Sequence, residues 1–194
     1  MQASDTYFSV DIETDGPIPG PYSLLSFAIV PAGSMRGGRF VRPKPSEDSL
    51  YLELQPISDE FEPEALAVNG LDRDRLAREG LTPAEAMKKA SEWIMDRCGG
   101  DEGVPVLVAY PLSFDWSFLH WYFIRFAGSS PFKHSRAFDV KTAIAVRGRR
   151  PIARSGHKHL PGSLVSTFPH THNALDDAIS QADVFAKLME WDGT

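Results

Sequence analysis

The sequence predicts an α/β fold in which a mixed sheet of about five strands, the second antiparallel, carries helices on both faces. Three features support this prediction. Residues 7–14 and 22–30 have the composition of two strands joined by a turn. Residues 104–110 form a nearly continuous apolar run, which is typical of a central strand covered on both faces. Residues 173–189 have the apolar spacing of an amphipathic helix.

The first strand carries two acids on one face. Because side chains alternate across a strand, its apolar residues fall on one side while Asp11 and Glu13 fall together on the other. Two neighbouring carboxylates repel each other unless a cation lies between them, and hard divalent ions prefer oxygen ligands. Asp11 and Glu13 are therefore candidate metal ligands. The alternative is an edge strand with a solvated polar face.

The strands that follow are separated by turn formers. Residues 15–21 are dense in glycine and proline and predict a reversal into the second strand. Pro31-Ala32-Gly33 is expected to end that strand. A third strand is predicted over residues 39–42 and a short fourth strand over residues 51–54.

The middle of the chain predicts helices. Short helical pieces begin at Pro63 and break at Asn69-Gly70. Thr82 has the features of an N-cap with Pro83 at the first helical position. Gly99-Gly100 is expected to end this helix.

A further helix is predicted directly after the central strand, starting near Ser113. Asp115 shares its stripe with four large apolar residues, Phe118, Leu119, Tyr122 and Phe126. A buried acid is costly unless something compensates it. Asp115 is therefore a further candidate metal ligand, and a helix-capping role is the alternative.

The last third combines a basic segment with the terminal helix. Residues 138–146 are either a strand or a strand followed by a helix, and residues 147–171 form a long, proline-interrupted segment. In the terminal helix, Asp176 shares its side with Ser180 and other residues of a predicted solvent face. Asp177 lies on the side of Val184 and Leu188 and is the acid expected to be buried.

Length and composition favour a single domain over residues 1–194, since 194 residues suffice for one core and are few for two. Cys98 is the only cysteine, which excludes an internal disulfide framework and fits a reducing compartment. No apolar run approaches the roughly 20 residues that span a bilayer, and no signal-peptide pattern is present. We therefore expect a cytoplasmic protein with no membrane contact.

The charge is unevenly distributed. The net charge of −6 disfavours a protein that coats nucleic acid by bulk charge. Six cations nevertheless fall between Asp139 and Asp176, where no acid occurs: Lys141, Arg147, Arg149, Arg150, Arg154 and Lys158. This basic stretch either follows a phosphate backbone or is a solvated loop.

Together the candidate ligands form a set of four inward acids, Asp11, Glu13, Asp115 and Asp177. Four unpaired carboxylates would destabilise an apolar core, because burying a charge without a partner is costly. Two divalent cations about 3.5 to 4 Å apart would neutralise them, and such pairs catalyse in-line displacement at phosphorus.

Three motifs in this order resemble those of the DEDDh family of 3′-to-5′ exonucleases, which have a ribonuclease-H-like fold. They are residues 8–16 (FSVDIETDG), residues 113–119 (SFDWSFL) and residues 172–178 (HNALDDA). The match spans nearly the whole chain. It departs from the family at Tyr110-Pro111, where His-Asn is often found, and this puts base or sugar contacts in doubt.

The resemblance implies one exonuclease domain that removes nucleoside 5′-monophosphates from the 3′ end of single-stranded RNA or DNA. It implies that Asp11, Glu13, Asp115 and Asp177 bind two Mg²⁺ or Mn²⁺ and that His172 is the general base. Imidazoles accept protons near neutral pH, and His172 precedes the helix and so can reach the metals. His134, His157, His159 and His170 are expected to be surface residues.

The same resemblance implies substrate contacts by Thr14, Leu71 and Phe114. Leu71 is alternatively a core residue, and Phe114 is either a stacking surface for a base or a packing residue. A non-catalytic nucleic-acid-binding module of the same fold is the main alternative function, and a phosphomonoesterase or a scaffold are further ones. The sequence does not decide whether the substrate is RNA or DNA. It also leaves the oligomeric state open, and a homodimer is possible.

Overall fold

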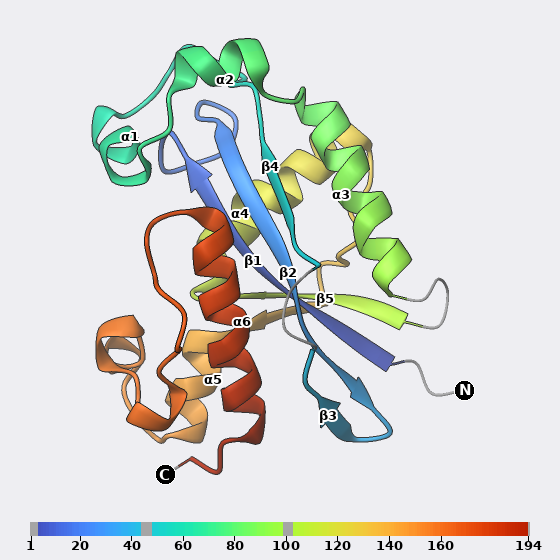
Figure 1. The fold of residues 1–194 in the computed structure, drawn as a ribbon, viewed down its shortest axis with the longest axis vertical. Coiled ribbons are helices and arrows are strands. Elements are labelled where there is room, and N and C mark those ends of the chain that lie inside the picture. The colour runs from blue at the N-terminus through green and yellow to red at the C-terminus, as the bar shows by residue number, and fades with distance from the viewer. Residues whose placement is uncertain (1–3, 44–47, 99–102, 194) are drawn as a thin grey trace.

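The computed structural model describes residues 4–43, 48–98 and 103–193. A mixed sheet forms the centre of the molecule, with the strand order β3-β2-β1-β5-β6 and with β4 paired to β2 (Figure 1). β1 runs antiparallel to β2 and parallel to β5, which in turn is parallel to β6. The strands are β1 (Ser4–Thr14), β2 (Leu24–Arg36), β3 (Arg39–Val41), β4 (Leu50–Glu53), β5 (Gly103–Ala109) and β6 (Ala137–Asp139).

Helices cover both faces of the sheet, which confirms the predicted fold class. In Figure 1, α6 lies in front of β1 and β2, and α4 passes behind them. One apolar cluster joins the sheet to α3 and α4, and a second cluster joins it to α5 and α6. The helices are α1 (Pro63–Asn69), α2 (Arg73–Glu79), α3 (Pro83–Arg97), α4 (Leu112–Tyr122), α5 (Val140–Arg147) and α6 (Ala174–Glu190).

β1 has the predicted alternation. Phe8, Val10 and Ile12 lie in the cluster under α3 and α4, whereas Tyr7 lies in the cluster under α6. The second half of β1 therefore presents its acidic side chains toward α6, on the face opposite to that of Ile12.

β1 also extends beyond its parallel neighbour. The pairing of β1 with β5 ends at Ser9 and Val108, while the pairing of β1 with β2 continues to Thr14 and Leu24. Among the described residues, no strand lies beside β1 on the β5 side after Ser9. α4 begins there, three residues after the end of β5. This arrangement brings the first turn of α4 next to the acidic end of β1.

β2 is longer than predicted, and the expected end at Pro31-Ala32-Gly33 is wrong. The strand continues to Arg36, with a register shift in which Phe8 faces Pro31 and Tyr7 faces Gly33. A bulge of this kind absorbs the proline, which cannot donate a ladder hydrogen bond. Gly33 has φ 130°, and a Cβ there would lie 2.5 Å from the Phe40 ring, so glycine fits where another residue would clash.

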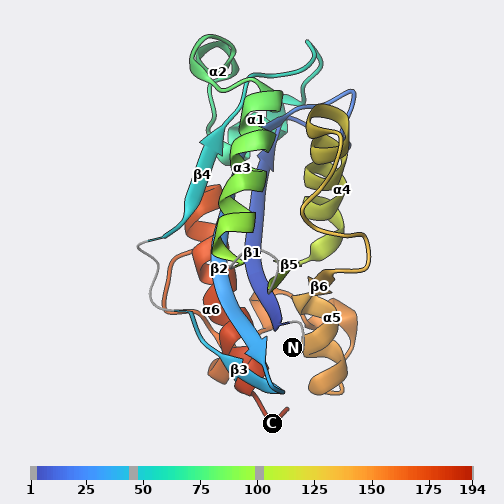
Figure 2. The same ribbon diagram turned by 90° about the vertical axis from the view of Figure 1, so that its right-hand side faces the viewer.

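Helix boundaries follow the sequence signals. Thr82 and Glu85 form a capping box at the start of α3, as the Thr82 signal predicted. α1 ends at Asn69, with Gly70 in the left-handed conformation. The expected helix end at Gly99-Gly100 lies outside the described residues. Both views place α1 and α2 at the end of the sheet where β1 ends (Figure 1, Figure 2).

Residues 138–146 take the strand-then-helix alternative, which supplies the sixth strand and α5. The segment between α5 and α6 is not one open loop, since it contains short 3₁₀ turns at Ile152–Arg154, His157–His159 and Gly162–Leu164. In the described part of the chain, no helix has the length and apolar character needed to cross a bilayer.

Candidate active site

The acidic end of β1 and the start of α6 meet across the sheet. Carboxylate oxygens of Asp11, Glu13 and Asp177 all lie within 4.8 Å of one another, although these residues come from opposite ends of the chain. Asp177 is 4% exposed, whereas Asp11 and Glu13 are partly exposed. The three acids thus form a cluster with an open side, which is the geometry that a metal with substrate access requires.

Asp115 adjoins this cluster from the first turn of α4. It is 6% exposed, and its charge acts on that of Asp11. The capping alternative for Asp115 is wrong, because Pro111 occupies the N-cap position. Asp139 performs that role instead, accepting a hydrogen bond from the Leu112 amide at 2.7 Å while it also caps α5 through Thr142. Asp139 thereby fixes the start of α4 and the position of Asp115.

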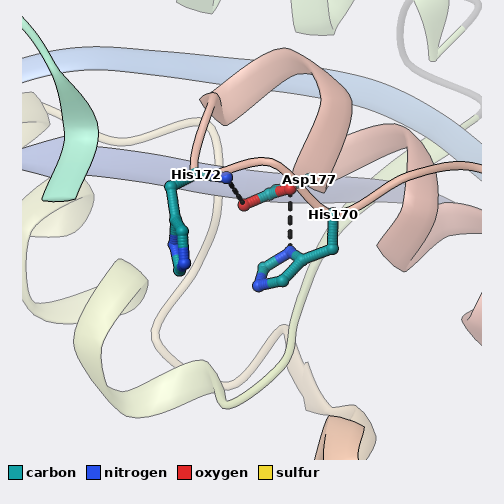
Figure 3. Close-up of side chains that lie close together, drawn as sticks. All are labelled: His170, His172 and Asp177. Carbon is teal, nitrogen blue, oxygen red and sulfur yellow. Dashed lines mark hydrogen bonds and ion pairs between the residues drawn. The ribbon is translucent and has the colours of Figure 1, made fainter.

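Asp177 is held by the chain that precedes its helix. Its carboxylate accepts hydrogen bonds from the amides of Thr171 at 2.8 Å and His172 at 3.1 Å. The ring Nδ1 of His170 lies 2.8 Å from the same carboxylate. Figure 3 shows the rings of His170 and His172 on the same side of Asp177. The carboxylate orientation is therefore set before any ligand binds.

α6 otherwise follows its predicted faces, with one exception. Val184 and Leu188 are buried on the side of Asp177, as expected. Ser180, predicted on the solvent face, is 5% exposed. α6 packs so closely against β1 and β2 that its buried arc is wider than the apolar stripe alone indicates.

Burial and mutual repulsion disfavour the charged forms of the acids. Burial raises the pKa of Asp11 well above its ordinary value, and repulsion from the other three acids raises it further. Burial also raises the pKa of Glu13 to about 8, with a smaller contribution from Asp177. Burial raises the pKa of Asp115 to about 8, although hydrogen bonds from the backbone of Asp115 and Ile12 favour its charged form.

In the described part of the chain, no lysine or arginine side chain relieves the repulsion among Asp11, Glu13 and Asp115. Among the described residues, no lysine or arginine forms an ion pair with Asp11, Glu13 or Asp115. Gln181 donates to the Val10 carbonyl at 2.9 Å and approaches the Asp11 carboxylate at 3.5 Å, which helps to orient it. A set of carboxylate oxygens without cations is the donor set that hard divalent metals prefer. The residues present fit such ions.

The histidines before α6 are exposed, and two of them make contacts that the sequence did not indicate. His172 precedes α6, as predicted; it is exposed and adopts φ 58°. His170 is also exposed, but its contact with Asp177 makes it part of the site. The His157 ring stacks on that of His170, with centroids 5.0 Å apart, and lies tilted against the Tyr110 ring, with centroids 4.0 Å apart. His157 and His170 are thus exposed, as expected of surface residues, but their contacts also link both rings to Asp177.

The three substrate-contact candidates lie around the acidic end of β1 and α4. The Thr14 hydroxyl donates to the Gly16 carbonyl at 2.8 Å, and its own carbonyl accepts from Asn69 at 3.0 Å. Leu71 is half-buried and belongs to neither apolar cluster. Phe114 is 39% exposed and packs one edge against Phe118. Leu71 and Phe114 thus keep apolar surface available.

Several residues of the site were not singled out from the sequence. Asn69 links the segment that carries Leu71 to the end of β1, because it bonds both the Thr14 carbonyl and the Leu71 amide. Gln181 follows Asp177 by one helical turn, so helix periodicity contained its signal. His157 and His170 carried no such signal, since their stack depends on how the segment before α6 folds.

Solved structures with the same fold include nucleases. The nuclease domain of 3′hExo, described as a DEDDh family member bound to rAMP, has a TM-score of 0.68 at 12% identity, covering 96% of this chain and 92% of that one. A 3′-exonuclease described in recognition of the histone mRNA stem-loop has a TM-score of 0.68 at 13% identity, with 98% of this chain and 65% of that chain covered. E. coli Exonuclease I in complex with a dA16 oligonucleotide has a TM-score of 0.61 at 16% identity, over 97% of this chain and 41% of that chain.

Sequence comparison is more specific. The chain is 36% identical over 182 residues to the 3′-5′ DNA exonuclease Cap18 of Escherichia coli, covering 93% of this chain and 90% of the relative. It is 26% identical over 188 residues to Ribonuclease T of Baumannia cicadellinicola subsp. Homalodisca coagulata, covering 93% and 81%. The 3′-5′ exoribonuclease Rv2179c-like domain matches residues 72–189. The resemblance predicted from the three motifs is thus confirmed: the chain belongs to the family of Rv2179c-like 3′-5′ exoribonuclease domains and is a 3′-5′ exonuclease.

Proposed function

We propose that this chain is a metal-dependent exonuclease that hydrolyses phosphodiester bonds at the 3′ end of single-stranded RNA or DNA and releases nucleoside 5′-monophosphates. One observation carries the proposal. Acids from the first strand and the last helix place their oxygens within 4.8 Å of one another, with Asp115 beside them and no arginine or lysine paired to Asp11, Glu13 or Asp115 among the described residues. We also propose that residues 1–194 act as one exonuclease domain, since both ends of the chain contribute to this cluster.

The four acids would hold two Mg²⁺ or Mn²⁺. Such ions lower the pKa of an attacking water and stabilise the leaving 3′ oxygen when they are bound. Asp139 keeps Asp115 in place through the start of α4, and the amides of Thr171 and His172 keep Asp177 in place. Fixed carboxylates of this kind bind cations without further reorganisation of the chain.

His172 would act as general base. Its side chain is exposed next to Asp177 and lies on the segment before the helix. An imidazole there accepts the proton of the attacking water and later gives it to solvent. His170 already uses its Nδ1 on the Asp177 carboxylate, so we assign it to positioning Asp177 rather than to proton transfer.

The substrate would be a strand with a free 3′ end. The relatives and neighbours named above include proteins described with DNA and with RNA, which supports nucleic acid as the substrate class. Leu71 and Phe114 would contact the terminal bases with their exposed apolar surface, and the backbone around Thr14 would lie along the terminal nucleotide. A time course on matched RNA and DNA oligomers, with metal and with chelator, identifies the preferred strand.

Replacement of Asp115 by Ala tests the proposal. The variant loses a buried carboxylate that helps to bind the cations, so metal-dependent release of mononucleotides should be abolished. Release is measured on a 5′-labelled oligonucleotide, with circular dichroism as the control for folding. Full activity in the folded variant would refute the proposal.

Replacement of His172 by Ala separates proton transfer from metal binding. The rate should fall by about 10²- to 10⁴-fold, as expected for the loss of a general base. Metal binding, measured by calorimetry, should stay nearly intact because the acids are unchanged. Weakened metal binding in this variant would assign His172 to the metal site instead.

A further inference from the structure

The segment between α5 and α6 presents cations that have no ion-pair partner among the residues that the structure describes. Arg149, Arg154 and Lys158 are exposed, and none of them forms an ion pair within the described residues. Arginines elsewhere do pair with acids, as Arg42, Arg75 and Arg97 show. The sequence contains no acid between Asp139 and Asp176, so nothing within the segment neutralises these charges. Their charge is available to an anionic partner.

The segment that carries these cations is held in place by hydrogen bonds and by buried side chains. The hydroxyl of Tyr110, at the end of β5, donates to the Ser155 carbonyl at 2.7 Å, and Ser155 is fully buried. The Ser155 hydroxyl in turn donates to the Pro151 carbonyl at 3.0 Å. Leu164 is also fully buried, in the cluster beneath α6. A surface fixed in this way binds a ligand with little loss of backbone entropy.

α6 holds the later part of the same segment. The Lys187 ammonium donates to the Val165 carbonyl at 2.7 Å. Asp183 accepts hydrogen bonds from the Ser166 hydroxyl at 3.1 Å and the Thr167 amide at 3.2 Å. The helix that carries Asp177 therefore also positions the chain that leads back to Arg154 and Lys158.

The surface is continuous with the acidic cluster. Lys158 directly follows His157, whose ring contacts those of Tyr110 and His170. His170 contacts the Asp177 carboxylate at 2.8 Å. In Figure 1 the turns of the segment lie beside α5 and the lower half of α6, and the last part of the segment rises to the start of α6. A strand that enters the site thus has a cationic surface next to it.

We propose that Arg149, Arg154 and Lys158 bind the phosphate backbone of the strand upstream of the nucleotide being removed. This inference rests on the proposed function. Phosphates carry one negative charge per nucleotide, and neutralising them releases bound counterions, so affinity for a single strand falls with salt with a slope of about 0.7 per contact. The surface sets how much a longer substrate gains in affinity, while the acidic cluster acts on the terminal nucleotide.

The test compares two triple variants with the same change in charge. One is Arg149→Gln with Arg154→Gln and Lys158→Gln. The control is Arg36→Gln with Arg39→Gln and Lys89→Gln, which are exposed and unpaired cations of the described chain. Arg36 and Arg39 lie at the end of the sheet that is opposite to the acidic end of β1. Their neighbour Met35 pairs with Asp5, whereas Ser26 pairs with Glu13. Both triples are made in the Asp115→Asn chain so that the oligonucleotide is not degraded.

Binding is measured by fluorescence anisotropy as a function of salt, with a dinucleotide and with an oligomer of about 20 nucleotides. We expect the first triple to lower the salt slope for the longer oligomer by about 2 and its affinity by about tenfold or more. The affinity of the first triple variant for the dinucleotide should stay unchanged. The control triple variant should bind both the dinucleotide and the longer oligomer as tightly as the parent chain does. Tyr110→Phe, which keeps the charge but loses the anchor to Ser155, should weaken only the longer oligomer.

The outcomes separate this inference from the proposed function. Equal losses in the two triples, or equal losses for both ligands, would overturn the cationic surface even if the wild-type chain releases nucleotides. A triple-specific loss for the longer oligomer would uphold the surface even if the wild-type chain released none. Unchanged oligonucleotide binding with lost binding to anionic phospholipid vesicles would overturn it in favour of a membrane surface.

Discussion

Asp11 and Asp15 lie four residues apart at the end of β1, and their surroundings differ in one decisive respect. The carboxylate of Asp15 is fully buried and has the Arg73 guanidinium 3.0 Å away, at ion-pair distance though not aligned as a hydrogen bond. It also accepts a hydrogen bond from the Ser23 amide. Asp11 has a weak contact with Gln181 and otherwise faces three other acids.

The pKa values reflect this difference. Burial raises the pKa of Asp15, but the Ser23 amide and the Arg73 charge pull it back. Burial raises the pKa of Asp11 well above its ordinary value, and the neighbouring acids raise it further. Compensation lowers the cost of burying an acid, whereas an acid buried without it destabilises the fold and is a candidate ligand for a cation. Asp15 ties α2, which begins at Arg73, to the end of β1.

The largest expected effect follows from Asp11→Asn. We expect mononucleotide release to fall below detection, because a neutral amide does not hold the cations. The same change removes a buried negative charge that repels its neighbours, so the melting temperature without metal should rise at alkaline pH. Activity assays and thermal melts of the same preparation measure both effects.

Asp176→Asn is the matched control for this variant. Asp176 is the partly exposed neighbour of Asp177 and accepts a hydrogen bond from the Thr171 hydroxyl. The substitution also removes one negative charge, but from a residue outside the acidic cluster. Activity should therefore stay within about threefold of wild type, as for an ordinary surface substitution. Equal losses of activity in Asp11→Asn and Asp176→Asn would show that the division between the acids is wrong.

Asp15→Asn should act on stability instead. It leaves the largely buried guanidinium of Arg73 without its partner, which costs about 3 kcal/mol of unfolding free energy. Urea unfolding measures the loss, and metal binding to the folded variant should be unchanged. A variant as stable as wild type would mean that Asp15 belongs with the uncompensated acids.

The smallest effect concerns pH. The raised pKa values of Glu13 and Asp115, each about 8, mean that the folded chain holds protons that the unfolded chain has already lost. Without metal, stability is therefore complete below the unfolded carboxyl pKa of about 4 and declines as the pH rises through about 8. Bound cations favour the charged forms, so they should offset this decline.

Thermal melts with Mg²⁺ or Mn²⁺ check this prediction. The increase in melting temperature on adding metal should be larger at pH about 8.5 than at pH about 6, because metal binding at the lower pH must first displace protons. The Asp15→Asn chain should retain this dependence. A metal effect that is independent of pH would show that the acids are charged before the metal binds.

The sequence determined those features that arise from local backbone geometry. A two-residue period placed Asp11 and Glu13 on one face of β1, and a helical period distinguished Asp177 from Asp176. Thr82 and its capping box marked the start of α3. These signals lie within a few residues of one another in the chain, so no knowledge of the rest of the fold is needed to interpret them.

Only the tertiary structure decided how distant segments pair. The bulge that carries β2 past Pro31 depends on its partner strand, and the buried position of Ser180 depends on how closely α6 packs on the sheet. The cap of α4 by Asp139, the pairing of Asp15 with Arg73 and the contact of His170 with Asp177 likewise join different elements. Whether an acid is compensated is a property of its neighbours in space, and a one-dimensional pattern does not contain those neighbours.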